Sequence, residues 1–551
     1  MTQIKTRLIE PCQDAYSYPL LIKNLLETPL IYSPDQEIVY RNLRRYDYKT
    51  FGQRVKQLAA MLTRLGVKPG DTVAVMDWDS HRYLECFFAV PMMGAVLHTI
   101  NIRLTPEQLI YTINHAEDDV ILVNEEFLPL LSSVKDRFET VKQVVLLTDS
   151  AEMPQSDLTF AGEYEDLMAD TAPEYDFPDF DENTMATTFY TTGTTGLPKG
   201  VFFSHRQIVL HTYGLMSGLC AYEAQASVNS SDIYMPMTPM FHVHAWGMPY
   251  LMTLLGTKQV YPGRYEPEML LKLIVTEKVT YSHCVPTIIN MLVSSPAISQ
   301  LNLEGWKVII GGSALPQGLC KAALEHGINL YSAYGMSETC PLLTVANIKP
   351  HLMEKSVDEQ VEIRCKTGLP VPNVRLEIVD TKGTPVPHDG QTAGEVVVRS
   401  PWLTQGYVKD EAKSQELWAN GWLHTGDIGV IDDEGYLKIT DRLKDVIKTG
   451  GEWISSLELE DIISRHEAVT EVAVVGVADE KWGERPLAMV VLNDAFKDKV
   501  TEADIQDFCM GFVKSGQIPK YGVPSKIVLD AEIPKTSVGK ISKKDIRAQY
   551  N

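Results

Sequence analysis

The stretch Tyr190–Gly200, YTTGTTGLPKG, contains three glycines, four threonines and one lysine within eleven residues. Glycine lets backbone N–H groups approach an anion closely, and consecutive N–H groups can form an anion-binding concavity. The threonine hydroxyls add further donors, and Lys199 adds a positive charge. The spacing does not fit G-x-x-x-x-G-K-[ST], so this is not a Walker A loop. The composition predicts a cradle for a polyphosphate rather than an ordinary surface loop.

On both sides of this loop, segments with helical periodicity are followed by short apolar runs. Residues 55–65 place apolar side chains at helical spacing, and a turn then leads into TVAVMDW at 72–78. The same order recurs in residues 107–126 and 269–287. Repeated helix-then-strand units predict an α/β protein with largely parallel sheets covered by helices.

The length predicts at least two domains, because one hydrophobic core rarely serves more than roughly 250–300 of the 551 residues. We place the boundary near Asp441, where EGYLKITDRLKD ends in charged residues. Residues 1–440 are expected to form a large domain of several parallel-sheet subdomains. Residues 441–551 are expected to form a small α/β domain, in which Thr501 and Asp504 have the spacing of a helix capping box.

Composition and charge exclude several classes of protein. The formal net charge is −22, and such a surface repels nucleic acid and anionic membranes, so no nucleic-acid partner is expected. The eight cysteines form no Cys-x-x-Cys pair and are interpreted as buried thiols of a cytoplasmic protein. The first residues lack the apolar stretch of a secretory signal, and no apolar run of about 18 residues predicts a transmembrane segment.

Further motifs follow the glycine-rich loop in order. They are GGSALP (311–316), YGMSET (334–339), GWLHTGDIG (421–429), DRLKDVIKTGGEWIS (441–455) and PKTSVGK (534–540). With residues 190–200, this series resembles the acyl-adenylate-forming superfamily of AMP-binding enzymes over nearly the whole chain. Within that superfamily, bacterial fatty-acyl-CoA synthetases are most similar in FHVHAWGMPY (241–250), KTGLPVPNVRL (366–376), GGEWISSLELE (450–460) and KWGERPLA (481–488).

The resemblance implies a two-step reaction and a small C-terminal domain that moves between the steps. A carboxylic acid, expected to be a medium- or long-chain fatty acid, reacts with ATP to give acyl-AMP and pyrophosphate. The acyl group then passes to CoA, and AMP leaves. Because the acid and ATP are both anions, cations and fixed dipoles must offset their repulsion. The implied cofactors are ATP, CoA and Mg²⁺, and relatives in this branch form homodimers through the large domain.

The resemblance also implies a nucleotide site. Tyr334 would stack on adenine, and Asp427 and Arg442 would bind the ribose, since a carboxylate accepts hydrogen bonds from vicinal hydroxyls. Glu338 and Thr191 would hold the metal ion, and Thr339 would contact the α-phosphate. The full ATP- and AMP-binding set is Thr191, Thr192, Gly193, Thr194, Thr195, Gly196, Lys199, Gly311, Gly312, Ser313, Tyr334, Gly335, Met336, Thr339, Asp427 and Arg442.

Three predictions concern the C-terminal part. Lys540 resembles the lysine that reaches the substrate carboxylate and the α-phosphate during adenylation, a task that suits a flexible ammonium. Lys444 occupies the position of the family's hinge residue, where other members carry aspartate. Reuse of one site for two reactions requires such a movement. The resemblance places CoA against Lys448, Gly450, Gly451 and Trp453.

His242 resembles the residue between the acid pocket and the phosphates and is assigned, with Lys540, Glu338 and Thr191, to the catalytic set. A zinc site at His242 and His244 is disfavoured because no third ligand is near in the sequence, so His244 is predicted to be packed in the core. The acyl pocket is assigned to Trp246, Val285 and Gly312. Trp246 resembles a residue that gates a fatty-acid tunnel, and a plain core tryptophan remains the alternative.

The identity of the acid is the least determined feature. Two segments that family members use around the acyl chain are apolar, which favours an apolar monocarboxylic acid; they contain Val209, Leu210, Leu215 and Met216, and Val285, Pro286, Ile288 and Ile289. A short branched or thioether acid is also compatible with these segments. The motifs leave open a stand-alone enzyme that loads a carrier protein, a luciferase-like oxygenase and a non-catalytic nucleotide sensor. Retention of Lys540, Glu338 and Asp427 argues against the sensor.

Overall fold

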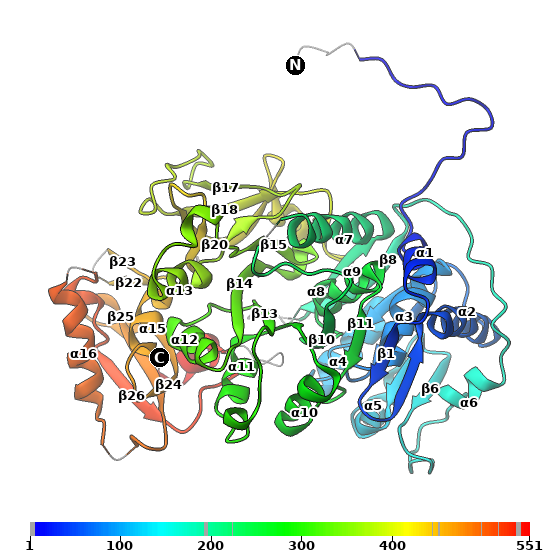
Figure 1. Cartoon of the computed structure of the whole chain (residues 1–551), viewed down its shortest axis with the longest axis horizontal. Coiled ribbons are helices and arrows are strands. Elements are labelled where there is room, and N and C mark those ends of the chain that lie inside the picture. The colour runs from blue at the N-terminus through cyan, green and yellow to red at the C-terminus, as the bar shows by residue number, and fades with distance from the viewer. Residues whose placement is uncertain are drawn as a thin grey trace.

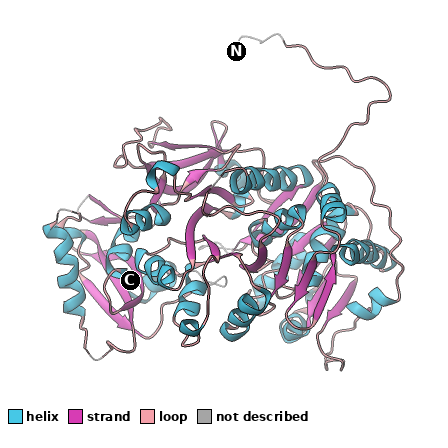
Figure 2. Ribbon diagram, in the orientation of Figure 1, coloured by secondary structure: helices cyan, strands magenta, loops and turns pink. Residues whose placement is uncertain are grey.

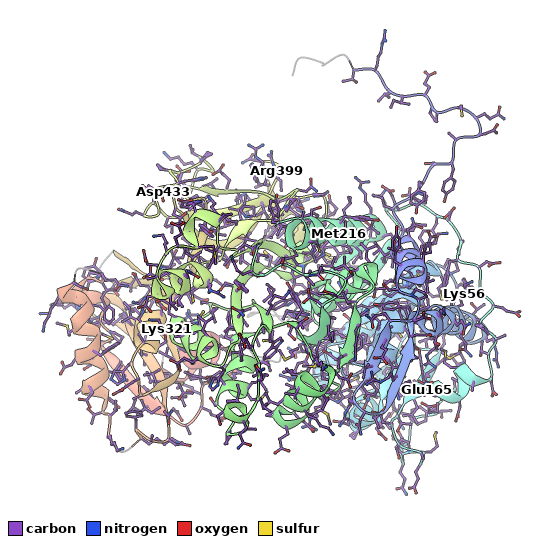
Figure 3. The ribbon with its side chains drawn as sticks, viewed as in Figure 1. Lys56, Glu165, Met216, Lys321, Arg399 and Asp433 are labelled. Carbon is purple, nitrogen blue, oxygen red and sulfur yellow. The ribbon has the colours of Figure 1, made fainter. Side chains whose placement is uncertain are left out.

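The computed structural model describes residues 6–191, 197–222, 224–442, 445–449, 452–497, 499–515, 517–535 and 541–550. Within these residues the strands form four sheets, and helices pack against them (Figures 1 and 2). Side chains fill the space between the ribbons (Figure 3). The fold is α/β, as predicted.

A seven-stranded sheet occupies the N-terminal part, in the order β7-β6-β5-β3-β4-β8-β9, and all neighbours are parallel except β8 and β9. Its strands are β3 (Thr72–Met76), β4 (Val96–Thr99), β5 (Asp118–Asn124), β6 (Gln143–Leu147), β7 (Gly162–Glu163), β8 (Met185–Thr191) and β9 (Lys199–Ser204). The helices of this part are α2 (Tyr48–Arg64), α3 (His81–Met92), α4 (Pro106–Ala116), α5 (Leu128–Ser132), α6 (Tyr164–Ala169) and α7 (His205–Cys220).

Local sequence explains where these helices begin. Asp47 accepts a hydrogen bond from the Thr50 N–H at 2.8 Å and caps α2, whose apolar face is buried. Thr105 and Gln108 form a capping box at the start of α4, with proline at its first position. The helices predicted from periodicity at residues 55–65 and 107–117 are therefore present, and strands follow them as predicted.

A nine-stranded sheet follows, in the order β16-β15-β14-β13-β12-β10-β11-β1-β2, with a parallel centre from β14 to β1. Its strands are β1 (Glu37–Tyr40), β2 (Arg44–Asp47), β10 (Ile233–Met237), β11 (Lys258–Tyr261), β12 (Tyr281–Cys284), β13 (Lys307–Ile310), β14 (Asn329–Gly335), β15 (Leu342–Val345) and β16 (Leu369–Pro370). The accompanying helices are α1 (Lys23–Tyr32), α8 (Val243–Trp246), α9 (Met248–Leu255), α10 (Pro267–Glu277), α11 (Pro286–Val293), α12 (Gln317–Glu325) and α13 (Val357–Cys365).

A five-stranded antiparallel sheet lies beside the two mainly parallel sheets. It contains β17 (Arg375–Val379), β18 (Gly394–Arg399), β19 (Trp418–Ala419), β20 (Trp422–Ile431) and β21 (Leu437–Arg442), with α14 (Glu411–Leu417) between β18 and β19. In the pairing of β20 with β21, Asp427 stands opposite Arg442. The sheet therefore pairs residues of two sequence motifs, and these two residues are fifteen positions apart in the chain.

The last sheet belongs to the C-terminal part of the chain, at the left of Figure 1. Its strands are β22 (Ile447–Thr449), β23 (Glu452–Ile454), β24 (Val469–Asp479), β25 (Gly483–Leu492) and β26 (Lys526–Asp530), and its helices are α15 (Ser456–Ser464), α16 (Glu502–Lys514) and α17 (Lys543–Tyr550). Thr501 and Asp504 form the predicted capping box of α16. A separate apolar core, which includes Ile462, Val490 and Ile505, fills this part.

All eight cysteines are free thiols, as predicted, but Cys12 is exposed and Cys220 and Cys365 are half-buried. The expectation that every thiol is buried was wrong for these three. Cys12 lies in the extended N-terminal segment, which leaves the body of the molecule in Figure 1 and has no core to enter. Among the described residues, no helix is both long and apolar enough to cross a membrane.

Candidate active site

The predicted site residues gather at the carboxyl ends of parallel strands. His242 follows β10, Val285 follows β12, and Gly311 follows β13. Tyr334 lies near the end of β14, and Thr191 ends β8 of the neighbouring sheet. In open α/β sheets, ligands bind in the crevice outside the carboxyl ends of the strands. The topology thus directs motifs from distant parts of the sequence to one edge.

Asp427 joins this edge to the antiparallel sheet. The Tyr334 hydroxyl donates to Asp427 Oδ2 at 2.7 Å, and Arg442 Nε lies 3.1 Å from Asp427 Oδ1. Asp427 is only 4% exposed, whereas the Arg442 side chain is 55% exposed. Burial, followed by the Asp427 charge, raises the pKa of Tyr334, which therefore stays a neutral donor. The arrangement offers an aromatic face, a fixed carboxylate and an accessible guanidinium, a set suited to a nucleoside.

Glu338 is anchored by a residue that the sequence motifs did not identify. The Tyr407 hydroxyl donates to Glu338 Oε1 at 2.8 Å, and the Thr404 N–H donates to the Glu338 carbonyl at 2.9 Å. Lys199 Nζ lies 4.7 Å from the centre of the Tyr407 ring, a cation–π contact. Tyr407 therefore connects the carboxylate of the YGMSET motif to the lysine of the glycine-rich loop.

The glycine-rich loop connects the paired ends of β8 and β9, where Thr191 stands opposite Lys199. The preceding residue, Tyr190, is fixed by a hydrogen bond of 2.8 Å between its hydroxyl and His115 Nδ1. Its ring also contacts that of His98, which is paired with buried Asp118 at 2.9 Å. The base of the loop is thus held rigidly from the side of the sheet.

Two predicted glycines are required by close contacts. A Cβ on Gly335 would lie 1.9 Å from the Pro341 carbonyl oxygen, and a Cβ on Gly311 would lie 2.9 Å from the Trp246 ring. Gly312 and Ser313, which follow, are exposed, and Gly312 has a φ of 79°. These positions leave backbone accessible at the end of β13, as a nucleotide site requires.

Two other predicted residues, Met336 and Thr339, lie in the YGMSET motif. Met336 is half-buried, and Thr339 is buried. The Thr339 hydroxyl is hydrogen-bonded to the backbone of Met336 at 3.0 Å and to the Pro341 carbonyl. It therefore closes a tight turn beside Glu338, and its predicted contact with the α-phosphate remains a prediction.

The segment after His242 forms a left-handed turn. The φ angles of Val243, His244, Ala245 and Trp246 are 47°, 54°, 47° and 60°, and Gly247 follows with 71°. Each non-glycine residue in this region costs roughly 1–2 kcal/mol, so the turn must be stabilised by its surroundings. It presses the Trp246 indole, 7% exposed, against Gly311 and the His283 ring, whose centre is 5.0 Å away.

His244 is packed in the core, as predicted. Its ring contacts those of Phe87, Phe189, Phe203 and Tyr250. Burial lowers the pKa of His244 to about 3, so the ring is neutral. In the part of the chain that the structure describes, no group of three metal-ligating side chains occurs.

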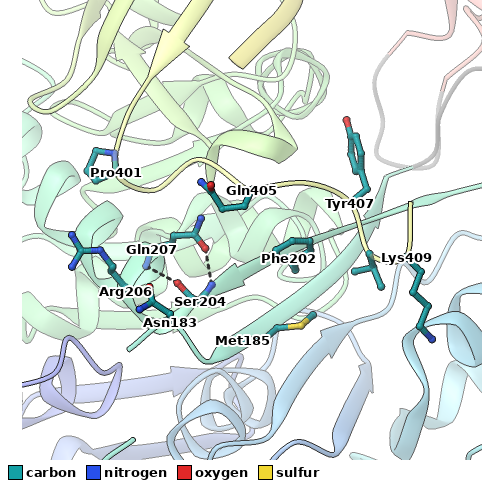
Figure 4. Close-up of a pocket in the computed structure, with 11 residues that line it drawn as sticks. Asn183, Met185, Phe202, Ser204, Arg206, Gln207, Pro401, Gln405, Tyr407 and Lys409 are labelled. Atoms are coloured by element: carbon teal, nitrogen blue, oxygen red, sulfur yellow. Dashed lines mark hydrogen bonds between the residues drawn. The ribbon is translucent and has the colours of Figure 1, made fainter. Parts of the chain in front are cut away.

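A cavity of about 530 Å³ lies between the start of α7 and the segment 401–409 (Figure 4). It shares Tyr407 with the candidate site, but the Tyr407 ring points away from the other labelled side chains. Ser204 and Gln207 at its wall form the capping box of α7. Its cations are paired, Arg206 with Glu182 and Lys409 with Glu117. The cavity therefore adds no obvious ligand group to the site.

Several predicted residues lie outside the described part of the chain: Thr192, Gly193, Thr194, Thr195, Gly196, Lys444, Gly450, Gly451 and Lys540. For Lys448 and Trp453 only the backbone is described, and the two residues stand opposite each other in β22 and β23. Tyr407 and His283 were not predicted from the sequence, because their partners Glu338 and Trp246 are distant in the chain and no local spacing marks them.

Comparison with known proteins identifies the class. The AMP-binding enzyme family model matches residues 31–408, and the model of its C-terminal domain matches residues 458–540. The chain therefore belongs to the AMP-binding enzyme family.

Two relatives and one solved structure show how far the likeness extends. A long-chain-fatty-acid–CoA ligase of Thermus thermophilus is 40% identical over 94% of this chain and 93% of its own length. A 3-methylmercaptopropionyl-CoA ligase of Ruegeria lacuscaerulensis is 38% identical over 97% of each chain. The crystal structure of the anthranilate CoA ligase AuaEII with anthranoyl-AMP is 24% identical, covers 97% of this chain and 98% of its own, and has a TM-score of 0.84. This last likeness supports the fold.

Proposed function

We propose that this chain is an AMP-forming acyl-CoA ligase that acts on an aliphatic monocarboxylic acid, with medium- and long-chain fatty acids preferred. The acid attacks the α-phosphorus of ATP, which releases pyrophosphate and gives acyl-AMP. The CoA thiol then attacks the acyl carbonyl, loses its proton and displaces AMP. The observation that carries the proposal is the Tyr334–Asp427–Arg442 cluster at the carboxyl edge of the nine-stranded sheet, within a chain whose relatives are CoA ligases.

The residues present fit ATP and Mg²⁺. Asp427 offers a fixed acceptor for ribose hydroxyls, and the exposed residues Gly312 and Ser313 leave backbone accessible at the end of β13. Glu338 and Thr191 would supply two oxygen ligands. Mg²⁺ is typically held by one or two carboxylates together with substrate phosphates. When bound, Mg²⁺ would neutralise phosphate charge.

The remaining roles follow the sequence motifs. Lys540 reaches the acid and the α-phosphate, His242 separates the acid from the phosphates, and Lys444 is the hinge. Lys448, Gly450, Gly451 and Trp453 line the CoA passage, and Trp246, Val285 and Gly312 line the acyl pocket. The burial of Trp246 against Gly311 is compatible with a gate and with a core residue alike.

The proposed domains are residues 1–440 and 441–551, with the smaller one mobile. Support comes from the change of sheet between β21 and β22, although the boundary falls inside β21. A homodimer and a cytoplasmic location are part of the same proposal.

A test of the proposed function is ATP–pyrophosphate exchange with straight-chain acids of increasing length, first without CoA and then with thioester detection. Acid-dependent exchange followed by acyl-CoA formation is expected. Exchange without thioester formation would favour an enzyme that loads a carrier protein. Because one relative is named for 3-methylmercaptopropionyl-CoA, 3-methylmercaptopropionate belongs in the same series as the second candidate substrate.

A further inference from the structure

The left-handed turn from Val243 to Gly247 needs support from its neighbours. Four successive non-glycine residues with positive φ persist only where surrounding contacts over-determine the backbone. The turn begins directly after His242 and ends at the residue that follows Trp246. Contacts in the segment before His242 therefore decide how the turn starts and where the His242 and Trp246 side chains point.

Two residues at the strand ends of the seven-stranded sheet clamp that segment. Asp79, shortly after β3, accepts a hydrogen bond from the Met240 N–H at 2.8 Å. Thr99, the last residue of β4, donates its hydroxyl to the Phe241 carbonyl at 2.9 Å. Two consecutive residues that follow β10 of one sheet are thus fixed by side chains of the other sheet.

Buried contacts hold Asp79 in place for this hydrogen bond. It is 3% exposed, the Tyr265 hydroxyl donates to its second oxygen at 2.5 Å, and the Gly263 N–H donates to its carbonyl at 2.9 Å. Burial raises the pKa of the Asp79 carboxyl to about 8. Both side-chain bonds survive protonation, because the acid form can donate to the Tyr265 oxygen while its other oxygen still accepts from Met240. A buried carboxyl with neutral donors is costly, which indicates a role that repays its retention.

We infer that Asp79, supported by Tyr265 and together with Thr99, is a positioning residue for binding of the carboxylic acid. The inference rests on the proposed function. The clamp fixes Met240 and Phe241, and so sets the direction of His242 and the seating of Trp246 on Gly311. The Tyr334–Asp427–Arg442 cluster belongs to other elements, so loss of the clamp should weaken use of the acid and leave ATP binding largely intact.

The test measures KM for the acid and for ATP separately in ATP–pyrophosphate exchange, with the straight-chain acid that the wild type uses best. Asp79→Ala is expected to raise the KM of the acid about tenfold or more and to change the KM of ATP less than about twofold. Thr99→Val, which keeps the shape and removes the hydroxyl that donates to the Phe241 carbonyl, should raise the KM of the acid about threefold to tenfold. This milder variant keeps the test decisive where Asp79→Ala fails to fold.

Two controls separate positioning from general stability. In Asp79→Asn the amide oxygen can accept from Met240 and the amide N–H can donate to Tyr265, so near-wild-type constants are expected. Asp77→Ala removes another buried carboxylate from the same strand end, bonded to Ser80 and Asn124. It should lower the melting temperature without changing the acid KM. Equal increases in both KM values, or an Asp77→Ala variant that behaves like Asp79→Ala, would overturn the inference. Absence of acid-dependent exchange in the wild type would instead overturn the proposed function, and the inference with it.

Discussion

At the scale of single residues, Asp427 is the best-defined group of the candidate site. Its two oxygens are held by Tyr334 and Arg442, so an incoming nucleoside meets a carboxylate that is already oriented. Asp427→Asn should raise the KM of ATP about tenfold to a hundredfold, because charge-assisted hydrogen bonds contribute about 1.5–3 kcal/mol each. Asp432→Asn is the matched control: Asp432 pairs with Lys366 near the other end of the same two strands, and its loss should leave the KM of ATP unchanged. The KM of ATP in ATP–pyrophosphate exchange, measured for both variants, tests this prediction.

The Tyr407 hydroxyl contacts Glu338, so its loss is expected to affect the orientation of that carboxylate. Tyr407→Phe removes the hydrogen bond to Glu338 Oε1 but keeps the ring beneath Lys199. If Glu338 holds Mg²⁺, a less well oriented carboxylate should require about threefold to tenfold more Mg²⁺ for half-maximal exchange, while the maximal rate changes less. A Mg²⁺ titration of both proteins measures this. A lower maximal rate with an unchanged Mg²⁺ requirement would contradict the assignment. The control variant is Tyr436→Phe. The Tyr436 hydroxyl donates to the Asn347 carbonyl.

The raised pKa of Asp79 has a consequence for stability. The folded protein keeps this proton up to pH about 8, whereas the unfolded chain releases it near pH 4. Between these values the unfolded state binds fewer protons, so the contribution of Asp79 to the free energy of unfolding falls as pH rises. The Asp79→Asn variant does not titrate at this position. Its free energy of unfolding should therefore rise relative to that of the wild type as the pH increases from 5.5 to 8. Denaturant unfolding of both proteins at these two pH values tests this, and a constant difference would argue against the raised pKa.

At the scale of elements, the left-handed turn predicts an unusually small effect on stability for one substitution to glycine. Glycine adopts positive φ without strain, so Ala245→Gly should recover about 1–2 kcal/mol and lose a similar amount from the missing methyl group and the freer unfolded chain. Its net effect should be within about 0.5 kcal/mol of zero. Ala323→Gly in the right-handed helix α12, at an equally buried position, should cost about 1.5–2 kcal/mol. Equal losses for the two variants would mean that the turn carries no strain.

Elements differ in how well the sequence predicts them, and the reason is the range of the interactions. Helices α2 and α4 were predictable because their caps and apolar faces lie within a few neighbouring residues. The turn at 243–247 was not, because its conformation depends on Asp79 and Thr99, which are more than a hundred residues away. Asp427 and Arg442 were both predicted to bind ribose from their motifs, but their pairing across β20 and β21 became visible only in the sheet. Tyr407 reaches Glu338 across 69 residues and has no local signature.

At the scale of the whole molecule, the connection between the third and fourth sheets joins two anchored ends. Arg442 lies beside Asp427 of the antiparallel sheet, and Asp445 pairs with Arg547 of the C-terminal helix α17. Arg442 and Asp445 are thus held by different parts of the fold, the antiparallel sheet and the C-terminal helix. A rotation of the C-terminal part can be absorbed by the backbone angles of a few residues.

The proposed hinge role of Lys444 leads to a prediction about the two half-reactions. Proline fixes φ and restricts the preceding residue, so Lys444→Pro should hinder the change of orientation. Exchange of ATP with pyrophosphate should stay within about threefold of the wild type, while acyl-CoA formation should fall more than about tenfold. Lys540→Ala should show the opposite pattern, with adenylation lost and transfer from supplied acyl-AMP to CoA retained. Lys497→Ala, which removes an exposed partner of Asp494, should alter neither half-reaction. Two variants with opposite patterns would establish that one site serves both steps in turn, whereas equal losses in both half-reactions would argue against a hinge at Lys444.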